Sequence, residues 1–174
     1  MRFNITQNKH TFTYLILIRI RLDALMTMKV ADIMRKKLET IEELSSIQEA
    51  AQKMKNKNVS SLVVVDANGK PQGIVTERDL VRKVCINDVR NSTVTNKEIM
   101  SSPIITIGSN SSPSEAADMM LQYNIRHLLV IRNANGNSDN SPIGILTPLD
   151  FTRYQEYAND TEKDSIEKIL EYYI

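Results

Sequence analysis

Two stretches of the sequence place a threonine three residues before an aspartate, in a pattern suited to binding a ligand. The first, "GIVTERD", carries Thr76 and Asp79, and the second, "GILTPLD", carries Thr147 and Asp150. If a helix begins after each threonine, the pair can cap its free backbone N–H groups. The same helix start can also attract a phosphate, and a carboxylate there can accept hydrogen bonds from both hydroxyls of a ribose. The local spacing is compatible with both roles.

The stretch "NIRHLLV" contains a second set of candidate residues. Arg126 and His127 stand before a run of apolar residues, at the expected start of a strand. A cation held there would suit a phosphate if it faced a cleft. The alternative is a solvated arginine beside a packed histidine. The corresponding residues in the first half of the chain are Ser60 and Ser61, which carry no charge.

All these residues belong to an internal duplication, which must be recognised before the elements are assigned. Residues 33–65 align with residues 99–131 at a constant offset of 66, with identical Ile-Met, Glu-Ala-Ala and Met positions. The offset then becomes 71, because the second copy has five more residues in the polar loop 133–141. Loops tolerate such insertions best. The chain therefore contains two copies of one structural unit.

Each copy predicts a short strand, a helix, two further strands and a second helix. The first helix of each copy starts at a capping box, formed by Ser46 with Glu49 and by Ser112 with Glu115, and Pro113 suits the first helical position. Apolar residues at helical spacing follow both boxes and predict one buried face for each helix.

The second part of each copy predicts a hairpin and a helix. The β-branched runs "SLVVVD" and "HLLVIR" are followed by turn residues and by "QGIVT" and "IGILT". The second helices are expected at Glu77 to Cys85 and at Pro148 to Tyr157. The fold class is therefore α+β with pseudo-twofold symmetry.

The repeated order "VADIM…TI…EAAQKM…VSSLVVVD…GIVTERDL" and "NKEIM…TI…EAADMM…IRHLLVI…GILTPLDF" resembles a tandem pair of CBS domains, named for cystathionine β-synthase. The resemblance covers about Lys29 to Gln155, with one repeat at 29–90 and the other at 91–158. It implies that the repeats pack sheet to sheet with two clefts between them. It also implies a disk-shaped dimer and adenosine-containing ligands.

The resemblance assigns roles to the candidate residues. In the family the aspartate holds the ribose, the threonine lies near the ribose or phosphate, and Arg or His at the strand start binds phosphate. A base at the position of Arg78 sometimes does the same, and Leu149 replaces it in the second copy. The adenine slots would be lined by two Thr-Ile pairs, although each pair could simply form a short strand: Thr40, Ile41, Thr106 and Ile107.

The family's symmetry also predicts which residues share a cleft. Asp79 and Thr76 should meet Arg126 and His127 in the cleft with the better phosphate end. In the other cleft, Asp150 and Thr147 should meet the two serines, with Arg78 as a further candidate cation: Ser60 and Ser61.

Composition excludes several kinds of site. The 174 residues carry a net charge of +1, which gives no global field to attract nucleic acid or an anionic membrane. Cys85 is the single cysteine, so an internal disulfide and a CxxC redox pair are impossible, and a reducing cytoplasm fits. His10 and His127 lie far apart, and we expect no metal and no cofactor. No Gly-rich phosphate loop or nucleophile-base pair supports catalysis.

The two ends of the chain need separate interpretations. Residues 1–28 are interpreted as an N-terminal extension with a misassigned start, and a short amphipathic strand or dimerisation tail is the alternative. The apolar run Tyr14 to Ile18, interrupted by Arg19 and Arg21, is too short to span a membrane. Residues 159–174 predict a helix whose apolar face packs on the repeats or on a dimer mate: Ile166, Ile169, Leu170 and Tyr173.

These features together predict a cytoplasmic regulatory module that is not an enzyme. It would sense AMP, ADP, ATP or a related adenosyl ligand, form a homodimer, and signal to an unidentified effector protein. A ligand-free scaffold for protein interaction is the alternative. Nucleic-acid binding is a weaker one, because the net charge is close to zero.

Overall fold

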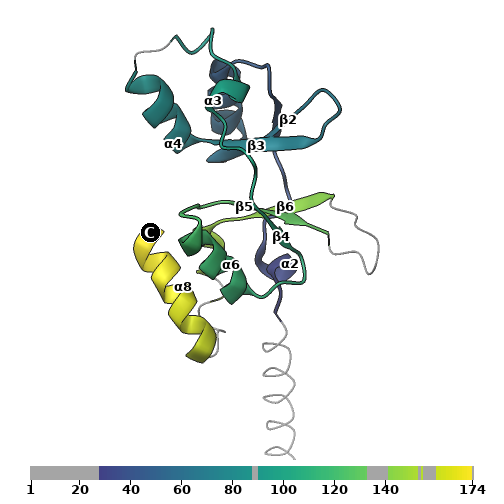
Figure 1. The fold of residues 1–174 in the computed structure, drawn as a ribbon, viewed down its shortest axis with the longest axis vertical. Coiled ribbons are helices and arrows are strands. Elements are labelled where there is room, and N and C mark those ends of the chain that lie inside the picture. The colour runs from purple at the N-terminus through teal and green to yellow at the C-terminus, as the bar shows by residue number, and fades with distance from the viewer. Residues whose placement is uncertain (1–27, 88–89, 133–140, 153, 155–159, 174) are drawn as a thin grey trace, which may run out of the picture.

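The chain forms two similar halves, each with one small sheet (Figure 1). The computed structural model describes residues 28–87, 90–132, 141–152, 154 and 160–173, so nearly all of the expected N-terminal extension lies outside the described residues. The first half contains α2 (Val30–Ile33), β1 (Thr40–Glu42), α3 (Ile47–Lys57), β2 (Ser61–Val65), β3 (Pro71–Thr76), α4 (Glu77–Asp79) and the π-helix η1 (Leu80–Cys85). The second half contains α5 (Asn96–Ile99), β4 (Thr106–Gly108), α6 (Pro113–Gln122), β5 (Leu128–Ile131), β6 (Pro142–Leu146), α7 (Pro148–Phe151) and α8 (Asp160–Tyr173).

The two sheets have the same topology. Their strand orders are β1-β2-β3 and β4-β5-β6, and in both the first pair is parallel and the second is an antiparallel hairpin. Each hairpin has an irregularity at the equivalent place, between Val64 and Val65 and between Val130 and Ile131. The predicted α+β fold with a duplicated unit is therefore confirmed.

The predicted helix starts are also confirmed. The Ser46 hydroxyl accepts a hydrogen bond from the Glu49 backbone at 3.3 Å, and Ser112 accepts one from Glu115 at 3.1 Å. The helix expected to end at Cys85 does so, although its last six residues are π-helical. The other second helix was expected to reach Tyr157 but ends at Phe151, because Thr152 and Tyr154 lie in turns; residues 155–157 lie outside the described residues.

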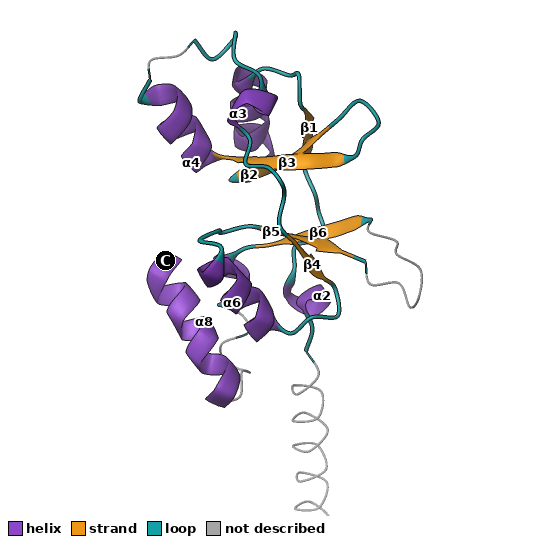
Figure 2. Ribbon diagram, viewed as in Figure 1, coloured by secondary structure: helices purple, strands orange, loops and turns teal. Residues whose placement is uncertain are grey.

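The sheets face each other in the middle of the molecule, and the helices cover their outer sides (Figure 2). Each sheet packs on its helices through a separate apolar core. One core contains Leu62, Val64 and Val75 beneath α3, and the other contains Leu128, Val130 and Leu146 beneath α6. The facing sides of the two sheets lie outside these cores, and Val63 and Leu129 are buried there.

Each core also takes a short helix from the other repeat. Val30 of α2 is fully buried in the core of the second half, and its backbone N–H donates to Ser111. Ile99 of α5 is buried in the core of the first half, and Asn96 donates its backbone N–H to Ser45. Neither short helix was predicted. The two repeats are thus interlocked.

The segments that leave α2 and α5 cross between the sheets. Arg35 forms two main-chain hydrogen bonds with Ile145 of β6, at 2.9 and 3.0 Å, and Ser101 forms two with Ile74 of β3, at the same distances. A glycine beside each bridge permits this close approach. A Cβ atom on Gly73 would lie 2.7 Å from the Ser101 carbonyl oxygen, and one on Gly144 would lie 2.8 Å from that of Arg35.

The C-terminal helix α8 packs on the second half beside α6 and α7 (Figure 1). Ile166 and Ile169 are fully buried, and Leu170 and Tyr173 are partly buried against the same core. The prediction that this face packs on the repeats is confirmed. Among the described residues, no helix is both long enough and apolar enough to cross a membrane.

We predict that Gly73→Ala and Gly144→Ala each lower the free energy of unfolding by about 1–3 kcal/mol, because the added methyl would overlap the bridging carbonyl. A glycine-to-alanine change at an unstrained position instead raises stability by about 0.4–1 kcal/mol. Urea unfolding followed by circular dichroism measures the sign. Unchanged stability in both variants would show that the crossing segments can move away.

Candidate functional site

The first helix start is built as the sequence predicted, around Thr76 and Asp79. One carboxylate oxygen of Asp79 accepts hydrogen bonds from the Thr76 backbone N–H at 2.9 Å and from the Thr76 hydroxyl at 2.6 Å. The Asp79 backbone N–H in turn donates to the Thr76 hydroxyl at 3.2 Å. The capping role is therefore real, and it holds the carboxylate in one orientation.

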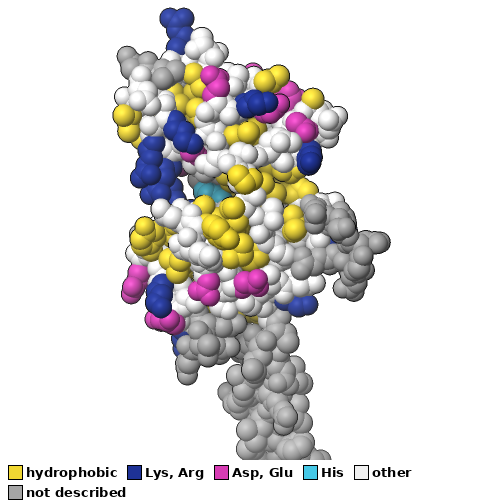
Figure 3. Space-filling view, viewed as in Figure 1, with side chains coloured by type: hydrophobic (Ala, Val, Ile, Leu, Met, Phe, Trp, Pro, Cys, Tyr) yellow, Lys and Arg dark blue, Asp and Glu magenta, His cyan; other side chains and the backbone are white. Residues whose placement is uncertain are grey.

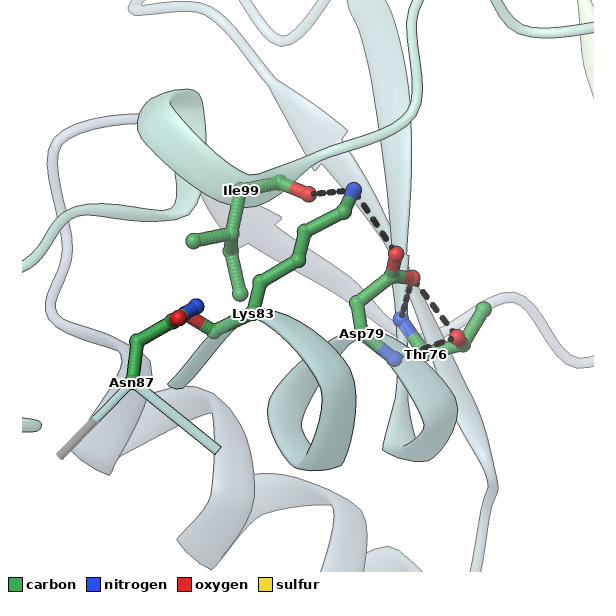
Figure 4. Close-up of polar contacts among 5 residues, drawn as sticks. All are labelled: Thr76, Asp79, Lys83, Asn87 and Ile99. Atoms are coloured by element: carbon green, nitrogen blue, oxygen red, sulfur yellow. Dashed lines mark hydrogen bonds and ion pairs between the residues drawn. The ribbon is translucent and has the colours of Figure 1, made fainter. Parts of the chain in front are cut away.

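The other carboxylate oxygen of Asp79 faces a lysine, as Figure 4 shows. Lys83 lies one turn later, and its ammonium group is 2.8 Å from Asp79 Oδ1 and 2.6 Å from the Ile99 carbonyl oxygen. The lysine therefore ties the helix start to the end of α5. Sequence reasoning missed Lys83, although its i,i+4 spacing from Asp79 was a usable signal.

The second helix start has the same cap but a different cation. One oxygen of Asp150 accepts from the Thr147 backbone N–H at 2.8 Å and from its hydroxyl at 2.7 Å. The other oxygen accepts from Arg35 Nε at 3.0 Å, across 115 positions of sequence. Arg35 stands at the position of Ser101 in the repeat alignment, so only this carboxylate receives an arginine.

A cavity of about 150 Å³, the first cleft, brings Asp79 together with residues of the second repeat. Thr76, Arg78 and Asp79 lie on one side, and Arg126 and His127 lie on the other. The cleft also has an apolar wall, which offers a slot for a flat ring: Ile74, Pro103, Ile104, Ile105 and Ile125. Apolar surface, carboxylate and cation thus share one cavity.

A larger cavity of about 800 Å³, the central chamber, adjoins the first cleft. The two share four lining residues, Thr76, Arg78, Arg126 and His127. The chamber also reaches Ser60 and Thr147, so it lies between both helix starts. The expected second cleft is therefore part of the chamber, and Arg35 lines it whereas Asp150 does not.

The chamber is basic even though the whole chain is nearly neutral. Its charged lining residues are one acid, Glu77, and four bases, Arg35, Lys55, Arg78 and Arg126. Figure 3 shows a group of Lys and Arg side chains beside a histidine where the two halves meet. Within the part of the chain that the structure describes, neither Arg78 nor Arg126 forms an ion pair. The chamber is therefore suited to an anion.

The charge states of Arg126 and His127 differ. Burial and the nearby Arg78 hold the pKa of Arg126 below its ordinary value, but an arginine stays charged at neutral pH. Burial and the adjacent Arg126 lower the pKa of His127 to about 4. At neutral pH the arginine therefore offers a positive charge, whereas the histidine offers only a neutral ring.

The residues proposed for the adenine slots occupy other places. Thr40 and Ile41 form part of β1, Thr106 and Ile107 form part of β4, and the two isoleucines are buried in the cores. None of the four lines either cavity, and each pair forms the short strand that was the alternative. The crossing segment instead brings residues 104–105 into the first cleft.

Ser61 also lies outside the lining of both cavities, whereas the neighbouring Ser60 lines the chamber. Ser61 begins β2 and pairs with Thr76.

Sequence reasoning did not find the contributions of Arg35 and Tyr173 to the chamber. Of the described residues, no group of three or more His, Cys, Asp or Glu side chains is arranged to hold a metal ion.

Comparison with known proteins identifies the fold and its family. The sequence model of the CBS domain family matches residues 30–85 and 97–157 of this chain. An uncharacterized protein of Methanopyrus kandleri is 31% identical over 145 residues, which cover 83% of this chain and 71% of that protein. A structure of an uncharacterized conserved protein from Pyrococcus horikoshii has a TM-score of 0.66 at 26% identity, covering 78% of this chain and 97% of that one.

A second similar structure contains ligands. It is the CBS domain pair of protein MJ0100 in complex with 5′-methylthioadenosine and S-adenosyl-L-methionine, with a TM-score of 0.62 at 30% identity. The similarity covers 73% of this chain and 94% of that pair. Since the family model matches both repeats and more than half of the sequence, this chain belongs to the CBS domain family as a tandem pair.

Proposed function

We propose that the chain is a regulatory module that binds an adenine nucleotide, AMP, ADP or ATP, or a related adenosyl ligand, in the first cleft. One observation carries the proposal. A capped carboxylate, Asp79, shares a cavity with an apolar wall and with two arginines, Arg78 and Arg126. These three kinds of surface suit the ribose, the base and the phosphate of a nucleotide. The adenosyl ligands of protein MJ0100 support the choice of adenine.

The ligand would lie with its base against Ile104 and Ile105 and its ribose hydroxyls on Asp79. The phosphates would then reach Arg126 and Arg78 and extend into the central chamber. Pockets for drug-sized ligands have volumes of about 300–1,000 Å³. The first cleft alone, at about 150 Å³, is smaller than this, so the phosphates need the chamber.

The second helix start is a poorer ribose site in this proposal. Arg35 covers the Asp150 carboxylate, and the strand start opposite carries Ser60 instead of an arginine. A ribose would have to displace the guanidinium before it could reach the carboxylate. We therefore expect one tight site per chain and a weaker second one.

We further propose that the module acts as a homodimer in the cytoplasm and passes its ligand state to an effector protein. Large apolar side chains on the helices that follow the two helix starts support an association surface. Val81 is 55% exposed, Ile86 is 72% exposed and Leu149 is 55% exposed. Clustered exposed apolar side chains are typical of such surfaces, and Val81 and Ile86 lie five residues apart, one in η1 and one directly after it, whereas Leu149 lines the rim of the chamber.

The first prediction of this proposal concerns the ribose and phosphate contacts. Asp79→Asn and Arg126→Ala should each weaken ATP binding about 10- to 100-fold in calorimetry, because each removes a hydrogen bond to a charged group. Asparagine at position 79 keeps an oxygen for the helix cap. Adenosine, which lacks phosphate, should be insensitive to Arg126→Ala.

Matched controls are Asp150→Asn, which makes the same change beneath Arg35, and Arg132→Ala, which removes an exposed arginine away from the cavities. Both should keep the tight site. If wild type binds none of AMP, ADP, ATP, adenosine and S-adenosylmethionine, the proposal is wrong and the ligand-free scaffold stands. If Asp150→Asn alone removes the tight site, the two clefts are assigned in reverse.

The second prediction concerns Arg35. Arg35→Ser installs the residue that the first cleft has at this position, Ser101, and uncovers the Asp150 carboxylate. We expect the weak second site to tighten at least about tenfold, which corresponds to 1.4 kcal/mol. Calorimetric titration with adenosine measures this change without the phosphate contribution. An unchanged second site would show that the arginine does not exclude the ribose.

The third prediction uses the lowered pKa of His127. The folded protein keeps this ring neutral down to a pKa of about 4, whereas the unfolded chain takes up a proton near pH 6.5. Stability is therefore lost as pH falls from 6.5 towards 4. His127→Asn should lose about 1–2 kcal/mol less than wild type between pH 6.5 and 4.5 in urea unfolding. Equal losses would contradict a ring that stays neutral in the folded protein.

A further inference from the structure

The C-terminal helix α8 ends beside the central chamber. Ile166 and Ile169 anchor it in the core of the second repeat, so its last turn has a defined position. The C-terminal end of the helix lies near the upper end of α6, close to the β4-β5-β6 sheet (Figure 1). Tyr173, in this last turn, lines the chamber. A segment outside both repeats therefore contributes to the cavity.

Tyr173 is linked to the strand start that carries Arg126. Its hydroxyl donates a hydrogen bond to Asn124 Oδ1 at 3.1 Å. Asn124 has a φ of 52° and forms the tight corner two residues before Arg126. Burial raises the pKa of Tyr173 above its ordinary value, with nearby Arg126 and Arg78 opposing, so the phenol is a neutral donor at neutral pH.

The two cavities place these donors in an order along the site. Arg126 lines both the first cleft and the chamber, whereas Tyr173 lines only the chamber. The Tyr173 hydroxyl lies at the border between the two cavities, because its partner Asn124 lines the first cleft. A ligand with its base and ribose in the first cleft would therefore meet Tyr173 with the phosphates that pass Arg126 into the chamber.

We propose that Tyr173 is a ligand-binding residue that recognises the distal phosphates of a nucleoside di- or triphosphate and thereby couples α8 to the ligand state. This inference rests on the proposed nucleotide site in the first cleft. On binding, the hydroxyl exchanges its bond to Asn124 for one to a phosphate oxygen. Because α8 carries the tyrosine, binding of ATP stabilises the last turn of the helix, and binding of AMP does not.

The test is calorimetry of Tyr173→Phe with adenosine, AMP, ADP and ATP. The change removes one oxygen atom and leaves the anchors of α8 in place. We expect ATP to bind about five- to tenfold more weakly and AMP and adenosine to bind within about twofold of wild type. The control is Tyr172→Phe, because that ring is 65% exposed and stacks edge-on against Tyr173 at 4.7 Å. The Tyr172→Phe variant should bind all four ligands with the affinities of the wild type.

Hydrogen exchange supplies a second readout. ATP should slow amide exchange at residues 170–173 in wild type but not in Tyr173→Phe, and AMP should leave these residues unchanged in both. Equal weakening of all four ligands would show that Tyr173 only positions Asn124, and unchanged ATP affinity would overturn the inference outright. In both outcomes an Asp79-dependent site in wild type would leave the proposed function standing. Absence of any binding to wild type would reject both proposals.

Discussion

The site depends on two main-chain bridges that hold the crossing segments against the sheets. Ser101 is bonded to Ile74, and Arg35 is bonded to Ile145, each through two hydrogen bonds. Because each segment starts on one core and continues into the sheet of the other, the bridges bring the two sheets face to face. Both helix starts then border one chamber, and residues far apart in sequence share one cleft.

The backbone is nearly symmetric, but the side chains that line the cavities are not. At one pair of equivalent positions the second repeat has Ser101 where the first has Arg35, and at another it has Arg126 where the first has Ser60. The arginine at position 35 neutralises Asp150, whereas the one at position 126 carries no ion pair among the described residues. Each carboxylate thus has a cation, Lys83 for Asp79 and Arg35 for Asp150, but only Asp79 lines a cavity that also contains an arginine without an ion pair among the described residues.

Much of the fold could be predicted from the sequence because its signals are local or repeated. Ser46 and Ser112 mark helix starts through residues three positions later, and the hairpins follow from apolar runs separated by turn residues. The threonine-aspartate pairs likewise identified both caps, since a cap needs only its own turn. Thr106 and Ile107 were predicted to line a cleft but lie in β4, and the crossing-segment residues that line the first cleft are two positions earlier, Ile104 and Ile105, because the sequence does not show where a crossing segment ends and its strand begins.

The sequence by itself determined the duplication, the order of the strands and of the helices that follow them in each copy, and the candidate roles of Asp79 and Arg126. Only the tertiary structure decided that α2 packs on the second core and α5 on the first, that Arg35 covers Asp150, and that Tyr173 reaches the chamber. These contacts join residues that no local pattern relates, and Arg35 and Asp150 lie 115 positions apart. They arise because two interlocked cores must each bury their apolar faces, and the packing that achieves this sets which polar side chains meet.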